Sequence, residues 1–330
     1  MCRDFRGRPT IAKAATETTE FTKKSNLDSV FSVAAFFLLQ GDIVKFAKLH
    51  GLGNDFLIAE SDVRSSLPEL AQRICDRHCG VGADGIIFYQ PAANDPDAEF
   101  SALIFNADGS QAEMSGNGVR CLATFFHHAG RCSADAIRIR TVAGIKRLEL
   151  KHKDRNVFVF RCSMGQPILD PARIPAHLAG PLPVLGHTLE TQAGAVKVTP
   201  SSMGNPHCST FWPDLDRAPI DQLGPALEHH PCFPNRTNVE FIQVLDAHHL
   251  RVAFWERGVG PTKASGTGSS AAAVAAVLNG LAETPIVIRT ELGELNVEWS
   301  PGEELFLTGP AEFICAGDYF VPALRSAHER

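Results

Sequence analysis

Two short stretches, SGNGVRCLA at residues 115–123 and SGTGSSAAA at residues 265–273, carry most of the information about the fold of this chain. Both begin with a Ser-Gly-x-Gly pattern. Nine residues before each leading serine stands a polar residue that ends a strand-like run, Asn106 in one case and Glu256 in the other. A device repeated about 150 residues apart indicates two halves built on one plan. The alternative is a chance similarity of two glycine-rich turns.

The sequence around these stretches predicts more strands than helices. Each Ser-Gly-x-Gly pattern opens a helix, and Gly130 and Gly280 are expected to end these two helices. Further helices are predicted at 67–78 and 219–229, and strands at 44–60 (a hairpin), 136–150, 156–163, 194–199, 237–245, 250–255, 285–290, 294–299 and 304–308. Because strands and helices rarely alternate one for one, the fold class predicted is α+β, with antiparallel or mixed sheet around a helix.

Composition limits the function. The chain has 330 residues, of which 44% are hydrophobic and 21% charged, which is typical of a globular protein of about two domains. A net charge of −6 gives no basic field for a phosphate backbone, so nucleic acid is not an expected partner. The nine scattered cysteines favour a reducing cytoplasm over a disulfide-rich secreted scaffold. Cys75 and Cys79 have no second pair at zinc spacing, so no metal site is predicted.

The first 43 residues differ from the rest. Residues 30–39, VFSVAAFFLL, resemble the apolar core of a secretory signal, but Glu17, Glu20 and Asp28 precede them. We interpret residues 1–43 as a disordered extension or a misassigned start, because a clean strand pattern begins at Val44. No apolar run approaches the roughly 20 residues that cross a bilayer, so no membrane partner is expected. Proline-rich sequence at 166–184 is predicted to connect the two halves.

The two helix starts predict an anion site. A helix N-terminus exposes backbone N–H groups and the positive end of the helix dipole, and glycine lets a ligand come close. Gly116 with Asn117, and Gly266 with Thr267, are therefore candidate carboxylate cradles, each preceded by a serine. If the halves face each other, Ser115 and Ser265 flank one small anion. This arrangement suits removal of a proton from one face of a carbon and its return to the other.

Six motifs, in order and spacing, resemble those of diaminopimelate epimerase, a cofactor-independent amino-acid epimerase. They are GLGNDF, GVGADG, FNADGSQAEMSGNGVRC, SMGNPHC, NRTNVEF and WERGVGPTKASGTG, and the resemblance covers about residues 44–325. It implies two pseudo-symmetric domains, each a curled mixed or antiparallel sheet around a central helix, with the active site in the interdomain cleft. The expected domains are 44–160 plus 311–330, and 161–310. The resemblance also implies a homodimer and a small amino-acid substrate, without metal or pyridoxal phosphate.

Roles for single residues follow from the same resemblance. Asn54, Asn106, Asn205 and Asn238 are similar to the residues that hold the substrate's distal end or line the cleft, Glu256 and Arg257 to the pair that grips its ammonium and distal carboxylate, and His207 to the histidine near the reacting centre. Each has a plainer alternative: turn capping for the asparagines, a surface ion pair for Glu256 and Arg257, and a buried structural imidazole for His207.

The chain departs from the family at the reacting positions, where Ser115 and Ser265 replace a thiolate base and a thiol acid. A cysteine at a helix N-terminus supplies thiolate near neutral pH, whereas an unassisted hydroxyl does not. Pro261-Thr262-Lys263-Ala264 also replaces the usual Glu-Thr-x-Ala. Three interpretations stay open: an epimerase of LL- and meso-diaminopimelate that has lost both bases, a relative that isomerises, racemises or dehydrates another small amino or carboxylic acid, and a catalytically silent amino-acid-binding protein.

Overall fold

The computed structural model describes residues 43–60, 66–112 and 114–321. The extension predicted for residues 1–43 lies outside this part of the chain, except for Ile43. The helices are α3 (Leu67–Ile74), α4 (Gly116–His128), α5 (Ile220–Glu228) and α6 (Gly266–Leu278), with short 3₁₀ turns at Pro171–Arg173 and Leu215–Arg217. The strands are β1 (Ile43–Gly51), β2 (Asn54–Glu60), β3 (Gly85–Pro91), β4 (Phe100–Asn106), β5 (Gln111–Ala112), β6 (Ala136–Thr141), β7 (Gly144–Asp154), β8 (Val157–Gly165), β9 (His187–Thr191), β10 (Gly194–Ser202), β11 (Pro206–Phe211), β12 (Asn238–Asp246), β13 (His249–Glu256), β14 (Gly260–Thr262), β15 (Ile286–Thr290), β16 (Gly293–Glu298) and β17 (Leu305–Phe320).

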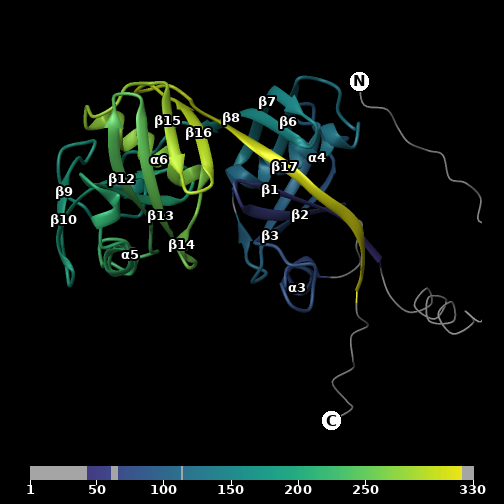
Figure 1. The fold of residues 1–330 in the computed structure, drawn as a ribbon, viewed down its shortest axis with the longest axis horizontal. Coiled ribbons are helices and arrows are strands. Elements are labelled where there is room, and N and C mark those ends of the chain that lie inside the picture. The colour runs from purple at the N-terminus through teal and green to yellow at the C-terminus, as the bar shows by residue number, and fades with distance from the viewer. Residues whose placement is uncertain (1–42, 61–65, 113, 322–330) are drawn as a thin grey trace, which may run out of the picture.

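Two lobes lie side by side, and the long strand β17 crosses from one to the other (Figure 1). In the N-terminal lobe the pairing runs in a closed ring, β1-β2-β3-β4-β6-β7-β8-β17 and back to β1. In the C-terminal lobe the pairing runs from β17 through β16, β15, β13, β12 and β11 to β10. Parallel and antiparallel pairs both occur, and the predicted α+β class with two similar halves is confirmed.

Each lobe encloses one helix, α4 in the first and α6 in the second (Figure 1). In α6, every residue from Gly266 to Ala276 is buried. A helix surrounded by strands has no polar face, and the run of alanines keeps it thin enough for strands to approach on several sides. Helix α4 is wider, with Leu122 and Phe126 fully buried against its sheet.

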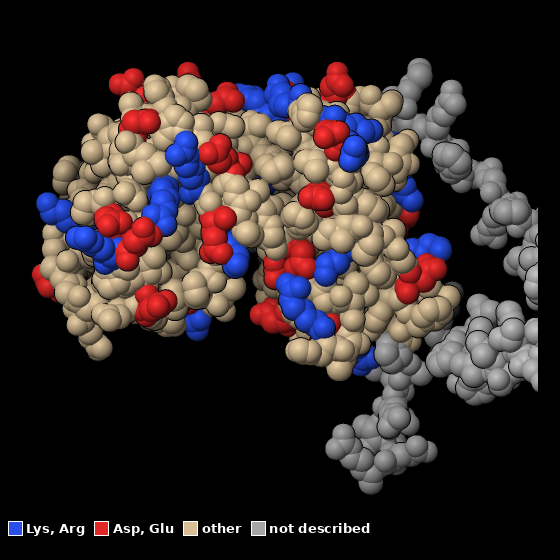
Figure 2. All heavy atoms as spheres, in the orientation of Figure 1, with Lys and Arg blue, Asp and Glu red and all other residues tan. Residues whose placement is uncertain are grey.

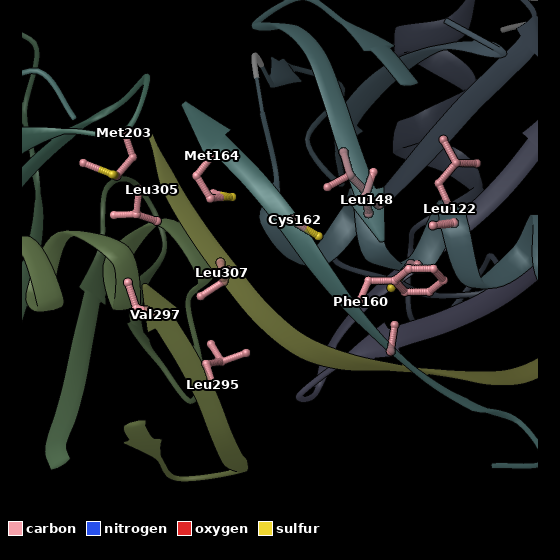
Figure 3. Packing of buried hydrophobic residues seen from close by; sticks show 14 of the residues in the cluster. Leu122, Leu148, Phe160, Cys162, Met164, Met203, Leu295, Val297, Leu305 and Leu307 are labelled. Atoms are coloured by element: carbon pink, nitrogen blue, oxygen red, sulfur yellow. The ribbon is translucent and has the colours of Figure 1, made fainter. Parts of the chain in front are cut away.

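One hydrophobic core runs through both lobes. Met164 at the end of β8 and Leu305 and Leu307 on β17 lie where the lobes meet, beside Met203 of the C-terminal lobe (Figure 3). Strand β8 pairs along its length with the first half of β17, residues Leu305 to Glu312. The domain limits expected at 160/161 and 310/311 fall inside these two strands, so the chain passes between lobes within continuous sheet.

Some elements differ from the expected ones for local reasons. The helix expected at 67–78 ends at Ile74, because the Asp76 carboxylate accepts the N–H groups of His78 (2.8 Å) and Cys79 (2.6 Å) and forms a turn. The strand expected at 304–308 continues to Phe320 as β17. Strand β11, which carries His207, was not expected at all.

Candidate active site

A cleft of about 1070 Å³ lies between the two lobes. The space-filling view shows the molecule hollowed there, with acidic and basic side chains on both sides of the opening (Figure 2). The starts of α4 and α6 form its floor, and loops from both lobes form its walls. The sequence-predicted residues that line the cleft are Asn54, Asn106, Ser115, Gly116, Asn117, Asn205, Asn238, Glu256, Arg257, Ser265, Gly266 and Thr267.

The two serines are the N-caps of the two helices. The Ser115 hydroxyl accepts the N–H of Gly118 at 3.0 Å, and the Ser265 hydroxyl accepts the N–H of Gly268 at 3.2 Å. Their backbones have nearly the same extended conformation, with φ/ψ of −140°/117° and −137°/127°. Serine is among the best N-cap residues, so these positions help to start their helices as well as face the cleft.

The two helix starts almost touch. A Cβ placed on Gly116 would lie 3.6 Å from the Cα of Gly266, and one placed on Gly266 would lie 3.4 Å from the Cα of Gly116. The free N–H groups and positive dipole ends of two helices therefore converge on one small region. A carboxylate held there is flanked by Ser115 and Ser265.

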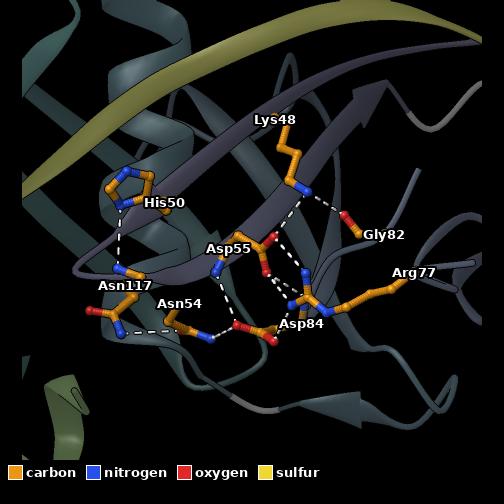
Figure 4. A network of polar contacts seen from close by, with 9 residues as sticks. Lys48, His50, Asn54, Asp55, Arg77, Gly82, Asp84 and Asn117 are labelled. Carbon is orange, nitrogen blue, oxygen red and sulfur yellow. Dashed lines mark hydrogen bonds and ion pairs between the residues drawn. The ribbon is translucent and has the colours of Figure 1, made fainter. Parts of the chain in front are cut away.

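A polar network forms the wall of the N-terminal lobe (Figure 4). The Asn54 side-chain amide donates to the Asp84 carboxylate (2.8 Å), and the Asn117 side-chain amide donates to the side-chain oxygen of Asn54 (3.1 Å). Asp84 also accepts from Arg77, whose guanidinium bridges it to Asp55. Asn54 is thus fixed in orientation by partners on both sides. Asn106 is exposed at the end of β4 and donates to the Ser110 hydroxyl.

The wall of the C-terminal lobe is built around Asn238. Its amide donates to the Pro206 carbonyl (2.9 Å), and its side-chain oxygen accepts the backbone N–H of Arg257 (2.9 Å). The exposed Arg257 guanidinium lies 3.3 Å from the Asn235 carbonyl, and the half-buried Glu256 precedes it at the end of β13. Burial raises the pKa of Glu256, while contact with the Ser265 hydroxyl acts in the opposite direction.

His207 does not reach the cleft surface. It is fully buried, and its two ring nitrogens contact the Glu240 carboxylate (2.6 Å) and the side-chain oxygen of Asn205 (2.9 Å). Glu240 also accepts from the Ser209 hydroxyl (3.1 Å). His207 was expected beside the reacting centre. It lies one layer below the cleft surface instead, where it contacts Asn205 rather than facing the cleft.

The cysteines offer no replacement base within the described residues. Cys121 and Cys208 are fully buried away from the cleft, and burial raises the pKa of Cys121 to about 12 and that of Cys208 well above its usual range. Cys75 lines the cleft, but burial raises its pKa to about 12 as well. These thiols stay protonated near neutral pH.

Several charged residues on the cleft wall were missed by sequence reasoning. Arg77, Asp84, Arg236 and Lys263 line the cleft. Asp84 lies inside the GVGADG motif, Arg236 inside NRTNVEF and Lys263 inside WERGVGPTKASGTG, so all three were within reach. Arg77 had no motif to mark it. In the described part of the chain there is no group of three or more His, Cys, Asp or Glu side chains placed to hold a metal ion. No helix there is long and apolar enough to cross a membrane.

The chain has a fold of two similar lobes, each enclosing one helix, which several solved structures share. Solved structures with this fold include a hydroxyproline epimerase from Agrobacterium vitis (TM-score 0.62, 14% identity, 84% of this chain and 93% of that chain) and a methylitaconate-delta-isomerase (TM-score 0.60, 14% identity, 88% and 100%). At this identity they show the fold alone.

Closer relatives fix the family. The family model for diaminopimelate epimerase matches residues 46–169 and 200–314. Proteins named diaminopimelate epimerase from Pelotomaculum thermopropionicum and Moorella thermoacetica are 45% and 43% identical, each over 83% of this chain and 98% of its own length. The chain belongs to the diaminopimelate epimerase family. It is an enzyme of the isomerase class.

Proposed function

We propose that this chain is a diaminopimelate epimerase-like isomerase, which interconverts LL- and meso-diaminopimelate and so serves lysine and peptidoglycan precursor synthesis. The observation that carries the proposal is the meeting of the two serine-capped helix starts at Gly116 and Gly266, in a cleft lined by both lobes. The names of the relatives at 45% and 43% identity support the choice of substrate.

The proposed binding follows from charge and hydrogen bonding. The α-carboxylate lies at the paired helix starts, where N–H groups and helix dipoles stabilise an anion. Glu256 accepts the α-ammonium group, and Asn54, Asn106, Asn205 and Asn238 contact the rest of the substrate. The Arg257 guanidinium binds the distal carboxylate by a charge-assisted fork. No metal and no pyridoxal phosphate take part.

In the proposed reaction one serine, as its alkoxide, takes the α-proton on one face of the α-carbon and becomes a hydroxyl, and the carbanion is stabilised through its carboxylate by the helix N-termini. The hydroxyl of the serine on the other side gives its own proton to the opposite face, which inverts the centre and leaves that serine as the alkoxide. Proton exchange with solvent returns the two serines to their starting states. Because serine hydroxyls are far weaker acids than thiols, we expect the reaction to be slow.

A second candidate is a relative acting on another small amino or carboxylic acid. The two serines favour it: both hydroxyls are engaged as caps and neither has a thiol's low pKa. A catalytically silent amino-acid-binding protein is the third candidate, and the same measurements separate the three.

The test combines binding with proton exchange. Calorimetry with LL- and meso-diaminopimelate should show binding that needs no added metal, and the Arg257→Ala variant should bind more weakly. Incubation in D₂O should exchange the α-proton slowly. Binding without exchange indicates the silent protein. Exchange in a different small acid, without binding of diaminopimelate, would establish the second candidate and overturn the first.

We also propose that the enzyme works in the cytoplasm as a homodimer. The scattered cysteines of the sequence support a reducing compartment, and the dimer rests on the family resemblance. Light scattering of the purified protein tests the dimer.

A further inference from the structure

Arg120 is a fully buried cation beneath the start of α4. Its side chain is 0% exposed, the most deeply placed arginine in the described residues. One guanidinium nitrogen donates to the Gly116 carbonyl at 3.0 Å, another donates to the side-chain oxygen of Asn117, and Nε lies 3.3 Å from the Pro310 carbonyl. Gly116 and Asn117 are the residues whose other faces line the cleft.

This cation is paired with neutral groups only. Among the ion pairs formed by residues 43–60, 66–112 and 114–321, none includes Arg120, whereas Arg77, Arg138 and Arg161 each have a carboxylate partner. Burial lowers the pKa of Arg120 from its usual range. Burying a charge without an opposite charge is unfavourable. In the protein without ligand, this unfavourable free energy of charge burial is located at the wall of the proposed anion site.

The internal repeat shows what the charge adds. The residue equivalent to Arg120 in α6 is Ser270, and its hydroxyl donates to the Gly266 carbonyl at 3.0 Å, the same contact that Arg120 makes with Gly116. The same backbone role is thus filled by a neutral group in one lobe and by a cation in the other. A hydrogen bond to this carbonyl does not require an arginine.

A second difference between the two repeats adds a negative charge instead of a positive one. Asn106 of the N-terminal lobe is replaced by Glu256 in the C-terminal lobe, and both line the cleft. The N-terminal lobe therefore has an added positive charge behind its helix start, and the C-terminal lobe has an added carboxylate beside its own. The two halves share one backbone arrangement, but the N-terminal side of the cleft has the added positive charge and the C-terminal side has the added negative charge.

We propose that Arg120 is a positioning residue that supplies the counter-charge for the ligand's carboxylate at the start of α4, acting through Asn117 and the first turn of the helix. This inference rests on the proposed function and deepens it. Arg120 attracts the carboxylate toward α4, while Glu256 draws the ammonium group toward the C-terminal lobe. An amino acid is thereby bound in one orientation, although the floor of the cleft is nearly two-fold symmetric.

The experiment compares meso-diaminopimelate with its two monoamides by calorimetry, in the unaltered chain and in Arg120→Met. Affinity for meso-diaminopimelate should fall about ten- to a hundredfold in the variant, as expected for a charge a few ångströms beyond direct contact. One monoamide, neutral at the reacting end, should bind both proteins equally, and the other should lose affinity as the parent does. Ser270→Ala, which removes the equivalent hydrogen bond without a charge, should cost less than Arg120→Met.

A second variant keeps the inference testable if Arg120→Met does not fold. In Arg120→Lys, a buried lysine loses its proton at a lower pH than arginine does. Its affinity for meso-diaminopimelate, relative to the unaltered chain at the same pH, should therefore fall between pH 7 and 9. The neighbouring thiols of Cys121 and Cys162 do not titrate in this range, because burial raises the pKa of each to about 12.

The outcomes separate this inference from the proposed function. If the unaltered chain binds no diaminopimelate, the proposed function fails and the inference fails with it. If the unaltered chain binds, but Arg120→Met binds all three ligands equally well or loses all three equally, Arg120 has only a structural role and this inference alone is overturned. A relative affinity of Arg120→Lys that does not change with pH also overturns it.

Discussion

Ser115 and Ser265 present hydroxyls at the two places where the helix starts meet. Each hydroxyl accepts an N–H from its own helix, so its oxygen is partly occupied as a cap. A thiol at the same place would be a weaker cap but a stronger acid, and the helix N-terminus would lower its pKa further. A hydroxyl rather than a thiol at these positions therefore favours helix stability over proton transfer.

Thiols at both positions are expected to raise the rate of proton transfer. In Ser115→Cys/Ser265→Cys, α-proton exchange of diaminopimelate in D₂O should rise about a hundredfold or more, because an acid and a base then stand on opposite faces of the α-carbon. Either single variant should give a smaller rise and serves as the control. Turnover by the unaltered chain at about 1 to 1,000 per second would contradict this account of the hydroxyls. So would a double variant that folds and binds but stays inert.

The buried pair of His207 and Glu240 is expected to matter for stability. Glu240→Ala removes the acceptor of both His207 and Ser209 in a fully buried place, so the free energy of unfolding should fall by about 3 kcal/mol or more in urea titration. Glu240→Gln, which keeps an acceptor of the same shape, should lose clearly less. Equal losses in the two variants would show that the hydrogen bonds at this position are unimportant.

At the scale of elements, the sequence was most informative where local chemistry sets the structure. The Ser caps and the closing glycines Gly130 and Gly280, which have φ of 66° and 67°, place α4 and α6 correctly. Strand β11 was missed because Pro206 opens it, and proline usually argues against a strand. The depth of His207 depends on packing between strands, which no local pattern contains. The role of Arg120 became visible only beside its repeat partner Ser270.

The network that joins β1, β2 and the loop after α3 should make stability depend on acid pH. Burial raises the pKa of Asp55, but hydrogen bonds from Arg77 and Lys48 outweigh this and leave it lowered. A lowered carboxyl pKa adds stability above the unfolded value, near 3.8, and that stability is lost as the pH falls through the folded value. The free energy of unfolding should therefore decrease below about pH 4.

Asp55→Asn should remove this decrease in the free energy of unfolding at acid pH. The variant should be less stable at pH 7, by about 1 to 3 kcal/mol, and its unfolding free energy should change less between pH 5 and pH 2. Asp318→Asn is the matched control, because Asp318 pairs with Lys45 at an exposed site where an ion pair contributes little. If the free energy of unfolding of Asp55→Asn fell as much at acid pH as that of the unaltered chain, the acid sensitivity would come from other carboxyls.

At the scale of the whole molecule, β17 unites the two lobes. It pairs with β1 and β8 in one lobe and with β16 in the other. Its Leu307 side chain packs against both helix starts, with Cδ2 3.7 Å from a Cβ placed on Gly116 and 3.4 Å from one placed on Gly266. The cleft floor therefore rests directly on the hydrophobic core. A substitution where β17 passes between the lobes should therefore affect both the stability of the molecule and the binding site.

Gly309 of β17 is the place to test this coupling. A Cβ there would lie 2.2 Å from Cδ2 of Leu295, which is fully buried in the C-terminal lobe, and 3.4 Å from Cζ of Arg120 in the N-terminal lobe. Gly309→Ala should therefore reduce the free energy of unfolding by about 2 kcal/mol through overpacking, and Leu295→Val alone should cost about 1 kcal/mol. Since valine withdraws the obstructing methyl group, the double variant should be more stable than the sum of the two losses predicts, by about 1 kcal/mol in a double-mutant cycle followed by urea unfolding. Strictly additive losses would mean that β17 moves aside at this point, and that the two lobes are less firmly joined there than the packing around Gly309 indicates.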